Sequence, residues 1–192
     1  MASSAMRLHD AQGHRLYLTA GERDAFRKAA DDSPRVIRTF GLTLFYTGCR
    51  ISEALEFTAD RVDFQGKALT FRSLKKLRQH VYRSVPIPEA FLDVLDLVHG
   101  IREGHAKGRL WGWTRKTGYN HITAVMKKAA LSGPQATPKG LRHGYAVACI
   151  EKGIQLNIVQ ELLGHAQMTT TAIYAHAVGA ERRSIVARLW EA

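Results

Sequence analysis

The chain has 192 residues, of which 45% are hydrophobic and 23% charged, so it is long enough to bury one sizeable core. Its 28 Lys and Arg against 17 Asp and Glu give a formal net charge of +11, which favours a polyanionic partner such as nucleic acid. A basic protein without such a partner remains the alternative on charge alone. There is no apolar run of bilayer length and no signal-peptide pattern, so we expect a cytoplasmic protein with Cys49 and Cys149 reduced and buried.

Two helices are predicted in the first quarter of the chain. Residues 1–18 show no regular pattern, and we expect a loosely ordered N-terminal extension there. Thr19 and Glu22 have the spacing of a capping box, which predicts a helix over residues 20–30. Apolar residues at helical intervals predict a second, buried helix over residues 35–47. Its expected core-facing side chains are Val36, Phe40, Leu44 and Phe45.

A charged residue, Arg50, follows the helix break at Gly48 and lies between two apolar segments. An unpaired buried charge is costly, so this side chain needs a partner. Glu53 could be that partner, or the arginine could point at a bound anion. Both interpretations stay open at this point.

Residues 61–88 change from helical to alternating periodicity. The alternation predicts strands over residues 67–73 and 81–87, joined as an antiparallel hairpin. A solvated basic turn is the ordinary explanation of its charges, but a rigid basic hairpin also suits a DNA groove. Its basic residues are Arg72, Lys75, Lys76, Arg78 and Arg83.

The middle of the chain adds two more helices. Pro88 is suited to open the first, and residues 118–131 are predicted to form the second. Trp111 and Trp113 between them are interpreted as core anchors rather than base-stacking platforms. Basic residues near the second helix are expected to contact DNA phosphates. They are Arg115, Lys116, Lys127 and Lys128.

The last third of the chain has an ordered series of polar residues. Lys139 and Arg142 lie three apart at a predicted helix start, and therefore project from neighbouring positions. A further helix, for which Asn157 is the expected cap, ends at Gly164 and leaves His165 just beyond it. A short segment after residue 168 then presents Tyr174.

These pieces together resemble the tyrosine recombinase, or phage integrase, family. The matching segments are TGCRISEAL, the basic hairpin, PKGLRHG, LLGH and TTTAIYAHA, in that order, across residues 19–177. The resemblance implies an α+β fold that is mainly helical. We expect a single compact catalytic domain over residues 19–180, with a small antiparallel three-stranded sheet.

The resemblance also implies a site-specific recombinase. Tyr174 would attack a scissile DNA phosphate, forming a 3′-phosphotyrosine and freeing a 5′-hydroxyl that later attacks another strand. Arg50 and Arg142 would hold the non-bridging oxygens, since guanidinium groups are planar, permanently charged donors. His165 would donate to the same phosphate.

Further roles follow from the same resemblance. Lys75, with Lys76 as second choice, would protonate the leaving 5′-oxygen as the general acid. Glu53 would orient the active-site arginine, and His143 would support the site from behind. No metal ion or other cofactor is required.

One residue departs from the family pattern, because Lys139 stands where histidine is usual. Lysine is a poorer base than histidine near neutral pH, so we expect an electrostatic donor to phosphate. The alternative, in which burial among cations makes it a base for the tyrosine, stays open.

The expected partners are double-stranded DNA, further copies of the chain in a tetramer, and accessory DNA-bending proteins. A helix over residues 181–192 would pack on a neighbouring protomer or fold back onto its own domain. We expect a bacterial, nucleoid-associated protein of a mobile element, and integration, excision, inversion and dimer resolution all fit.

A catalytically impaired DNA-binding module and a type IB topoisomerase-like enzyme are the alternatives to a recombinase. Family members also carry an N-terminal DNA-binding domain of about one hundred residues, so a piece of a longer recombinase and a minimal recombinase both fit.

Overall fold

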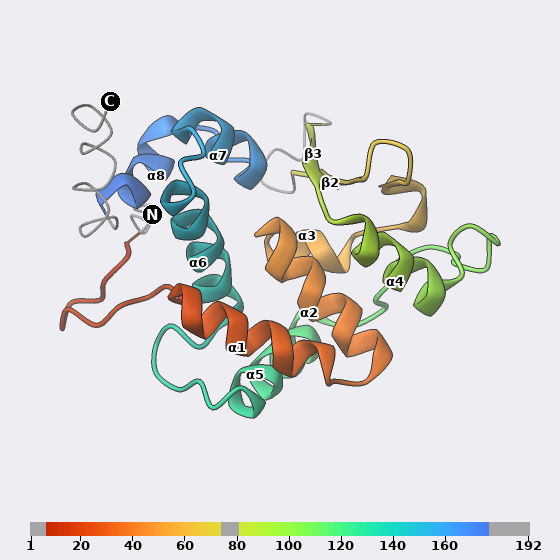
Figure 1. The fold of residues 1–192 in the computed structure, drawn as a ribbon, viewed down its shortest axis with the longest axis horizontal. Helices are drawn as coiled ribbons and strands as arrows, with labels where there is room; N and C mark the ends of the chain where they lie inside the picture. Colours follow the sequence, from red (N-terminus) through yellow and green to blue (C-terminus); the bar gives the residue numbers. More distant parts are fainter. Residues whose placement is uncertain (1–6, 74–80, 177–192) are drawn as a thin grey trace, which may run out of the picture.

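The computed structural model describes residues 7–73 and 81–176 of the chain (Figure 1). The described part is mainly helical with one antiparallel sheet in the order β1-β2-β3, which confirms the predicted fold class. The elements are α1 (Ala20–Asp31), α2 (Arg35–Thr47), α3 (Ile51–Leu55), the 3-10 helix η1 (Ala59–Arg61), β1 (Val62–Asp63), β2 (Ala68–Arg72), β3 (Tyr82–Pro86), α4 (Glu89–His99), α5 (Arg115–Lys128), α6 (Pro138–Glu151), α7 (Leu156–Leu163), α8 (Met168–Ala172) and the 3-10 helix η3 (Ile173–His176).

The predicted hairpin is confirmed in its pairing and nearly in its bounds. β2 and β3 pair from Ala68 with Pro86 to Arg72 with Tyr82. The Ser73 amide donates to the Val81 carbonyl at 2.8 Å, which extends the pairing by one residue toward the tip. The basic tip residues Lys75, Lys76 and Arg78 lie outside the described residues.

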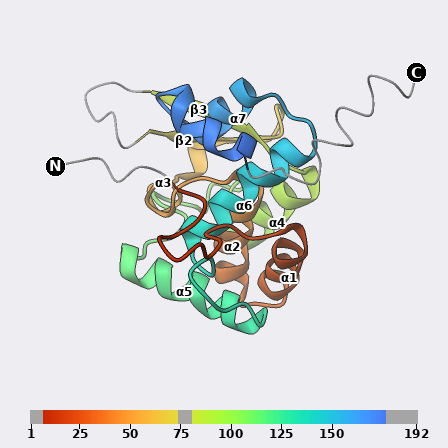
Figure 2. The same ribbon diagram turned by 90° about the vertical axis from the view of Figure 1, so that its left-hand side faces the viewer.

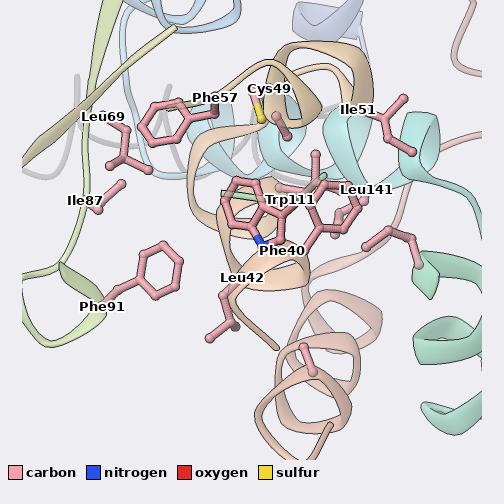
Figure 3. Packing of buried hydrophobic residues seen from close by; sticks show 14 of the residues in the cluster. Phe40, Leu42, Cys49, Ile51, Phe57, Leu69, Ile87, Phe91, Trp111 and Leu141 are labelled. Atoms are coloured by element: carbon pink, nitrogen blue, oxygen red, sulfur yellow. The ribbon is translucent and has the colours of Figure 1, made fainter. Parts of the chain in front are cut away.

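The main core lies where α2, α3 and the sheet face α4 and α5 (Figure 3). Trp111 is buried there beside Phe40, and its indole nitrogen donates to the Thr39 hydroxyl at 3.2 Å. Trp113 is partly buried and packs against the same core. The interpretation of both tryptophans as core anchors is therefore confirmed.

Helix α6 connects this core to a second, smaller one. It contacts α1, α2 and α5 on one side and α7 and η3 on the other. The second cluster includes Leu8, Val147, Val159, Leu163 and Tyr174. In both views α7 lies with the β2–β3 hairpin at one end of the molecule, and α5 lies at the other (Figures 1 and 2). The tyrosine thus belongs to the layer next to the hairpin.

Several local predictions need correction. Val36 is 40% exposed, because the core-facing stripe of α2 begins at Thr39. Helix α5 begins at Arg115 and not at 118, since the Thr114 hydroxyl accepts from the Thr117 amide. Asn157 lies inside α7, whose N-cap is Gln155 without a side-chain hydrogen bond.

The N-terminal segment is also more ordered than predicted. Residues 7–18 include an antiparallel bridge between His9 and Arg15, and both Leu8 and Leu18 are buried. The Leu18 amide donates to the Gly140 carbonyl at 3.2 Å, which ties this segment to α6. The predicted helix over residues 181–192 lies outside the described residues.

The expectations about the two cysteines and about membrane-spanning segments can be compared with the described part of the chain. Cys49 and Cys149 are both free and buried, as predicted. Across residues 7–73 and 81–176, we find no helix with the length and apolar character needed to cross a membrane.

Candidate active site

Arg50 is held at the start of α3 by Glu53, one turn further on. Gly48 ends α2 in the left-handed conformation, with φ of 58°, and turns the chain so that Arg50 becomes the N-cap of α3. The Arg50 backbone amide donates to Glu53 Oε2 at 2.9 Å, and its Nη1 donates to Oε1 at 2.7 Å. The Arg50 side chain is 27% exposed whereas that of Glu53 is 1% exposed. Arg50 therefore pairs with Glu53 and still reaches the surface, so the two interpretations left open by the sequence are compatible.

Glu53 is shared with a second arginine from the sheet. Arg83 Nη2 donates to Glu53 Oε2 at 2.6 Å, and the Arg83 side chain is 9% exposed. Burial opposes ionisation of Glu53, but the charges of Arg83, Arg142 and Arg50 outweigh it and hold its pKa below the ordinary value. Arg83 was predicted as a DNA contact on the flank of the hairpin. Its largely buried side chain is paired with the Glu53 carboxylate, and contact with DNA stays a prediction.

Arg142 binds the ends of two helices. It is buried on α6, where its Nη1 donates to the Gly48 carbonyl at 2.7 Å and its Nη2 to the Leu163 carbonyl at 2.8 Å. Carbonyls at helix C-termini lack partners in their own helix and carry partial negative charge, so they suit a guanidinium. Burial, followed by the charge of Arg50, lowers the pKa of Arg142 to about 10, which leaves it charged at neutral pH.

His165 follows Gly164, which ends α7 with φ of 65°. Its Nδ1 is hydrogen-bonded to the Thr171 hydroxyl at 2.9 Å, and both side chains are buried. Burial, then the charges of Arg142 and Arg50, lower the pKa of His165 to about 3, so the ring is neutral. Its Nε2 is buried without a hydrogen-bond partner in the described structure. In the tautomer whose Nδ1 accepts from Thr171, Nε2 carries the proton and can donate to an anion.

Tyr174 lies behind these groups in η3 and is fully buried. Its hydroxyl is hydrogen-bonded to His143 Nδ1 at 2.8 Å, and its ring is nearly parallel to that of His165, with 6.3 Å between centroids. Burial raises the pKa of Tyr174 to about 12, although the charges of Arg142 and Arg50 act in the opposite direction. Burial, then the charges of Lys139 and Arg142, lower the pKa of His143 to about 3. A neutral phenol therefore faces a neutral imidazole.

A cavity of about 700 Å³ opens beside these residues, between β3 and α7. Its lining includes Arg50, Arg83 and His165, and also Ser73 and Val81, where the described arms of the hairpin end. Tyr174 does not line it in this structure. Three guanidinium groups surround the carboxylate of Glu53, and the cavity lining also includes the carboxylate of Glu161. Three positive charges against two negative ones leave a surplus of one positive charge, which suits the site to an anion.

The other predicted residues are less closely associated with the cavity. Lys139 is exposed in the first turn of α6 and does not line the cavity. This exposure argues against a role as a buried base. Its positive charge helps to lower the pKa of His143. Arg72 is half-buried at the end of β2.

The basic residues of α5 are exposed at the opposite end of the molecule from α7 (Figure 2). Lys128 is paired with Asp32 at 2.7 Å, so its charge is partly neutralised. DNA contacts by Arg115, Lys116, Lys127 and Lys128 remain predictions. Among the described residues, no group of three or more His, Cys, Asp or Glu side chains could hold a metal ion.

Two contributors were missed by reasoning from the sequence. Arg83 shares a strand face with the buried Val85, so strict alternation along β3 could have placed it inward. Thr171 orients His165, but nothing in the run of three threonines distinguishes it beforehand.

Comparisons with known proteins agree with this geometry. The model of the "Phage integrase family" matches residues 17–181. The tyrosine recombinase XerC of Mycobacterium bovis is 35% identical over 156 residues, covering 74% of this chain and 50% of that protein. The chain spans about half the length of the curated relatives it matches.

Among solved structures, the XerA recombinase crystal structure aligns with a TM-score of 0.76 and 25% identity, covering 90% of this chain and 64% of the other. A post-cleavage complex of the XerH site-specific recombinase with its palindromic difH substrate aligns with a TM-score of 0.75 and 23% identity, covering 96% and 56%. That second likeness supports the fold alone. From the match over residues 17–181 and the convergence of Arg50, Arg142, His165 and Tyr174, we conclude that the chain belongs to the phage integrase family.

Proposed function

We propose that this chain cleaves and rejoins double-stranded DNA at specific sites through a 3′-phosphotyrosine intermediate on Tyr174. The observation that carries the proposal is the surplus of positive charge around Glu53, next to a cavity, with a buried phenol, Tyr174, stacked on His165 and within the field of Arg142 and Arg50. A phosphodiester makes use of the positive charge, of the cavity and of the phenol, because it is an anion that a phenol oxygen can attack. Family membership supports the same reaction.

In this proposal Arg50 and Arg142 bind the non-bridging oxygens, and His165 Nε2 donates to one of them. These donors stabilise the extra charge of the pentavalent transition state, because they are already oriented by Glu53, by two helix ends and by Thr171.

The covalent step exchanges one phosphodiester bond for another. The phenol oxygen of Tyr174 bonds to phosphorus as its proton passes to solvent, and the bond from phosphorus to the 5′-oxygen breaks. The 5′-oxygen takes a proton from a hairpin lysine, Lys75 or Lys76. Attack by a 5′-hydroxyl of another strand reverses these changes, so rejoining needs no external energy source.

The buried state of Tyr174 adds a requirement to this scheme. Its hydroxyl is engaged by His143 and does not line the cavity, so we propose that DNA binding moves η3 to bring the oxygen to the phosphate. The charges of Arg142 and Arg50 favour the phenolate, which assists the attack once the phosphate is bound.

We further propose that the reaction occurs in a homo-oligomer on DNA, with a tetramer as the complete assembly and DNA-bending proteins as accessory factors. The XerH recombinase was solved with a palindromic DNA. A palindrome has two equivalent halves, so two copies of one chain could bind such a site in the same way. Integration, excision, inversion and dimer resolution use the same chemistry at differently arranged sites.

A pool of nicked duplexes with a randomised core tests the proposal without knowledge of the target. The nick lets a short strand diffuse away after cleavage, so a covalent protein–DNA adduct accumulates on a denaturing gel. We expect an adduct with the wild-type chain and with Tyr119→Phe, a control on the exposed face of α5, and none with Tyr174→Phe. DNA binding without any adduct would favour the catalytically impaired module, and plasmid relaxation without strand exchange would favour topoisomerase-like activity.

A further inference from the structure

Arg83 connects three separate parts of the candidate site. From β3 its Nη2 donates to Glu53 Oε2 on α3 at 2.6 Å, and its Nε donates to the Leu162 carbonyl on α7 at 2.8 Å. Its guanidinium also lies 5.4 Å from the ring centroid of Phe71 on β2. One side chain thus joins the hairpin to the helix that carries Arg50 and to the helix that precedes His165.

The contact with α7 extends to the turn that places His165. A Cβ on Gly164 would lie 2.9 Å from Arg83 Nη1 and 3.1 Å from its Cδ, so the backbone passes directly against the guanidinium. Gly164 adopts a φ of 65°, and His165 is the next residue. The position of the Arg83 side chain therefore limits where the imidazole can lie.

The contact with Glu53 divides one carboxylate between two arginines. Oε1 accepts from Arg50 Nη1, whereas Oε2 accepts from Arg83 Nη2 and from the Arg50 amide. Without Arg83, Glu53 would keep only its two hydrogen bonds to Arg50. Its carboxylate could then rotate, and the direction of the Arg50 guanidinium would change with it.

A role in stability alone does not account for this arrangement. Arg83 Nη1 is buried without a hydrogen-bond partner among the described residues, and an unpaired buried donor costs about 1–3 kcal/mol. Arg83 lines the cavity, so the arginine lies at the edge of the candidate anion site and not deep in the core.

We propose that Arg83 is a positioning residue for DNA cleavage: it fixes Arg50 through Glu53 and His165 through Leu162 and Gly164, and so aligns both with the hairpin. The inference rests on the proposed phosphotyrosine reaction and adds to it a role that differs from DNA contact. The hairpin that carries Lys75 and Lys76 is thereby linked to the groups that bind the phosphate.

Single-turnover cleavage of the nicked duplex tests this role, with the rate at saturating DNA measured separately from the dissociation constant. Arg83→Met removes the charge and both donors at similar length, and Arg83→Lys keeps the charge but cannot reach both acceptors at once. The matched control is Arg23→Met, because Arg23 is also largely buried, donates to the Leu141 and Phe45 carbonyls, and has no carboxylate partner among its hydrogen bonds. Assays are run at a temperature where circular dichroism shows every variant folded.

We expect Arg83→Met to slow cleavage on the order of 100-fold, the effect of misplacing reacting groups by about 1 Å, with the dissociation constant changed less than about threefold. Arg83→Lys should recover part of the rate, and Arg23→Met should cleave at nearly the wild-type rate. If Arg83→Met does not fold, a rate loss of about tenfold or more in Arg83→Lys at unchanged affinity supports the role.

A wild-type rate in either folded Arg83 variant would overturn the inference, as would weaker DNA binding with an unchanged rate. A double variant with Glu53→Gln adds a check, since two residues acting through one another should not show additive losses. Absence of any Tyr174 adduct in the wild-type chain would instead refute the proposed function, so the two failures are distinguishable.

Discussion

Replacing Gly48 with alanine would test how the end of α2 supports both active-site arginines. Gly48 has a φ of 58°, its carbonyl accepts from Arg142, and Arg50 follows two residues later. A Cβ at this position would lie 2.4 Å from Tyr145 Cδ1 and 3.2 Å from Leu163 Cδ2, so these side chains of α6 and α7 would have to move away from the end of α2. We therefore expect losses of both stability and cleavage.

The magnitude follows from two contributions. A left-handed conformation costs a non-glycine residue about 1–2 kcal/mol. Forcing a methyl group into a packed region costs a further ~1–3 kcal/mol. The control is Gly153→Ala, because Gly153 has a φ of 76° but nothing within 4 Å of its Cβ position, so only the first contribution applies.

Thermal unfolding followed by circular dichroism measures the difference. For a chain of this length, 1 kcal/mol corresponds to about 2–4 °C, so Gly48→Ala should melt roughly 2–12 °C below Gly153→Ala. Where both variants are folded, Gly48→Ala should also cleave the nicked duplex more slowly than Gly153→Ala, because the Gly48 carbonyl that orients Arg142 has shifted. Equal melting temperatures and equal cleavage rates would refute the reasoning.

Two further predictions concern acid stability and Lys139. His143 and His165 have pKa values lowered to about 3 by burial, so between about pH 6.5 and 3 the unfolded chain binds more protons than the folded one. The free energy of unfolding should then fall with decreasing pH by up to about 1.4 kcal/mol per pH unit for each histidine, and equal urea midpoints at pH 7 and pH 5 would contradict it. Lys139→His should retain cleavage of the nicked duplex, because an imidazole N–H at this exposed position can also donate to a phosphate; complete loss of the adduct would show that the two residues are not interchangeable.

Local sequence signals predicted much of the fold. The capping box of Thr19 and Glu22 is present with both of its hydrogen bonds, and α2 has the bounds expected from its periodicity. These features depend on residues within one or two turns of one another, so a single sequence contains the necessary information.

Contacts between distant segments were not predictable in the same way. Arg83 lies 30 positions from Glu53 and 79 from Leu162, and its charge suggested an exposed DNA contact until the packing of β3 against α7 was known. Tyr174 was identified by its motif, but its burial against His143 depends on the second core between α6 and η3. Residue types and order predicted the chemistry, whereas the burial and the hydrogen bonds of each group required the tertiary structure.

Locating the covalent bond is the decisive measurement for the proposed phosphotyrosine intermediate. The adduct formed on nicked DNA would be digested with trypsin and nuclease, and the modified peptide sequenced by mass spectrometry. We expect one nucleotide joined through its 3′-phosphate to Tyr174, with a free 5′-hydroxyl on the released strand. Attachment at another residue, or linkage through a 5′-phosphate, would contradict the proposed intermediate.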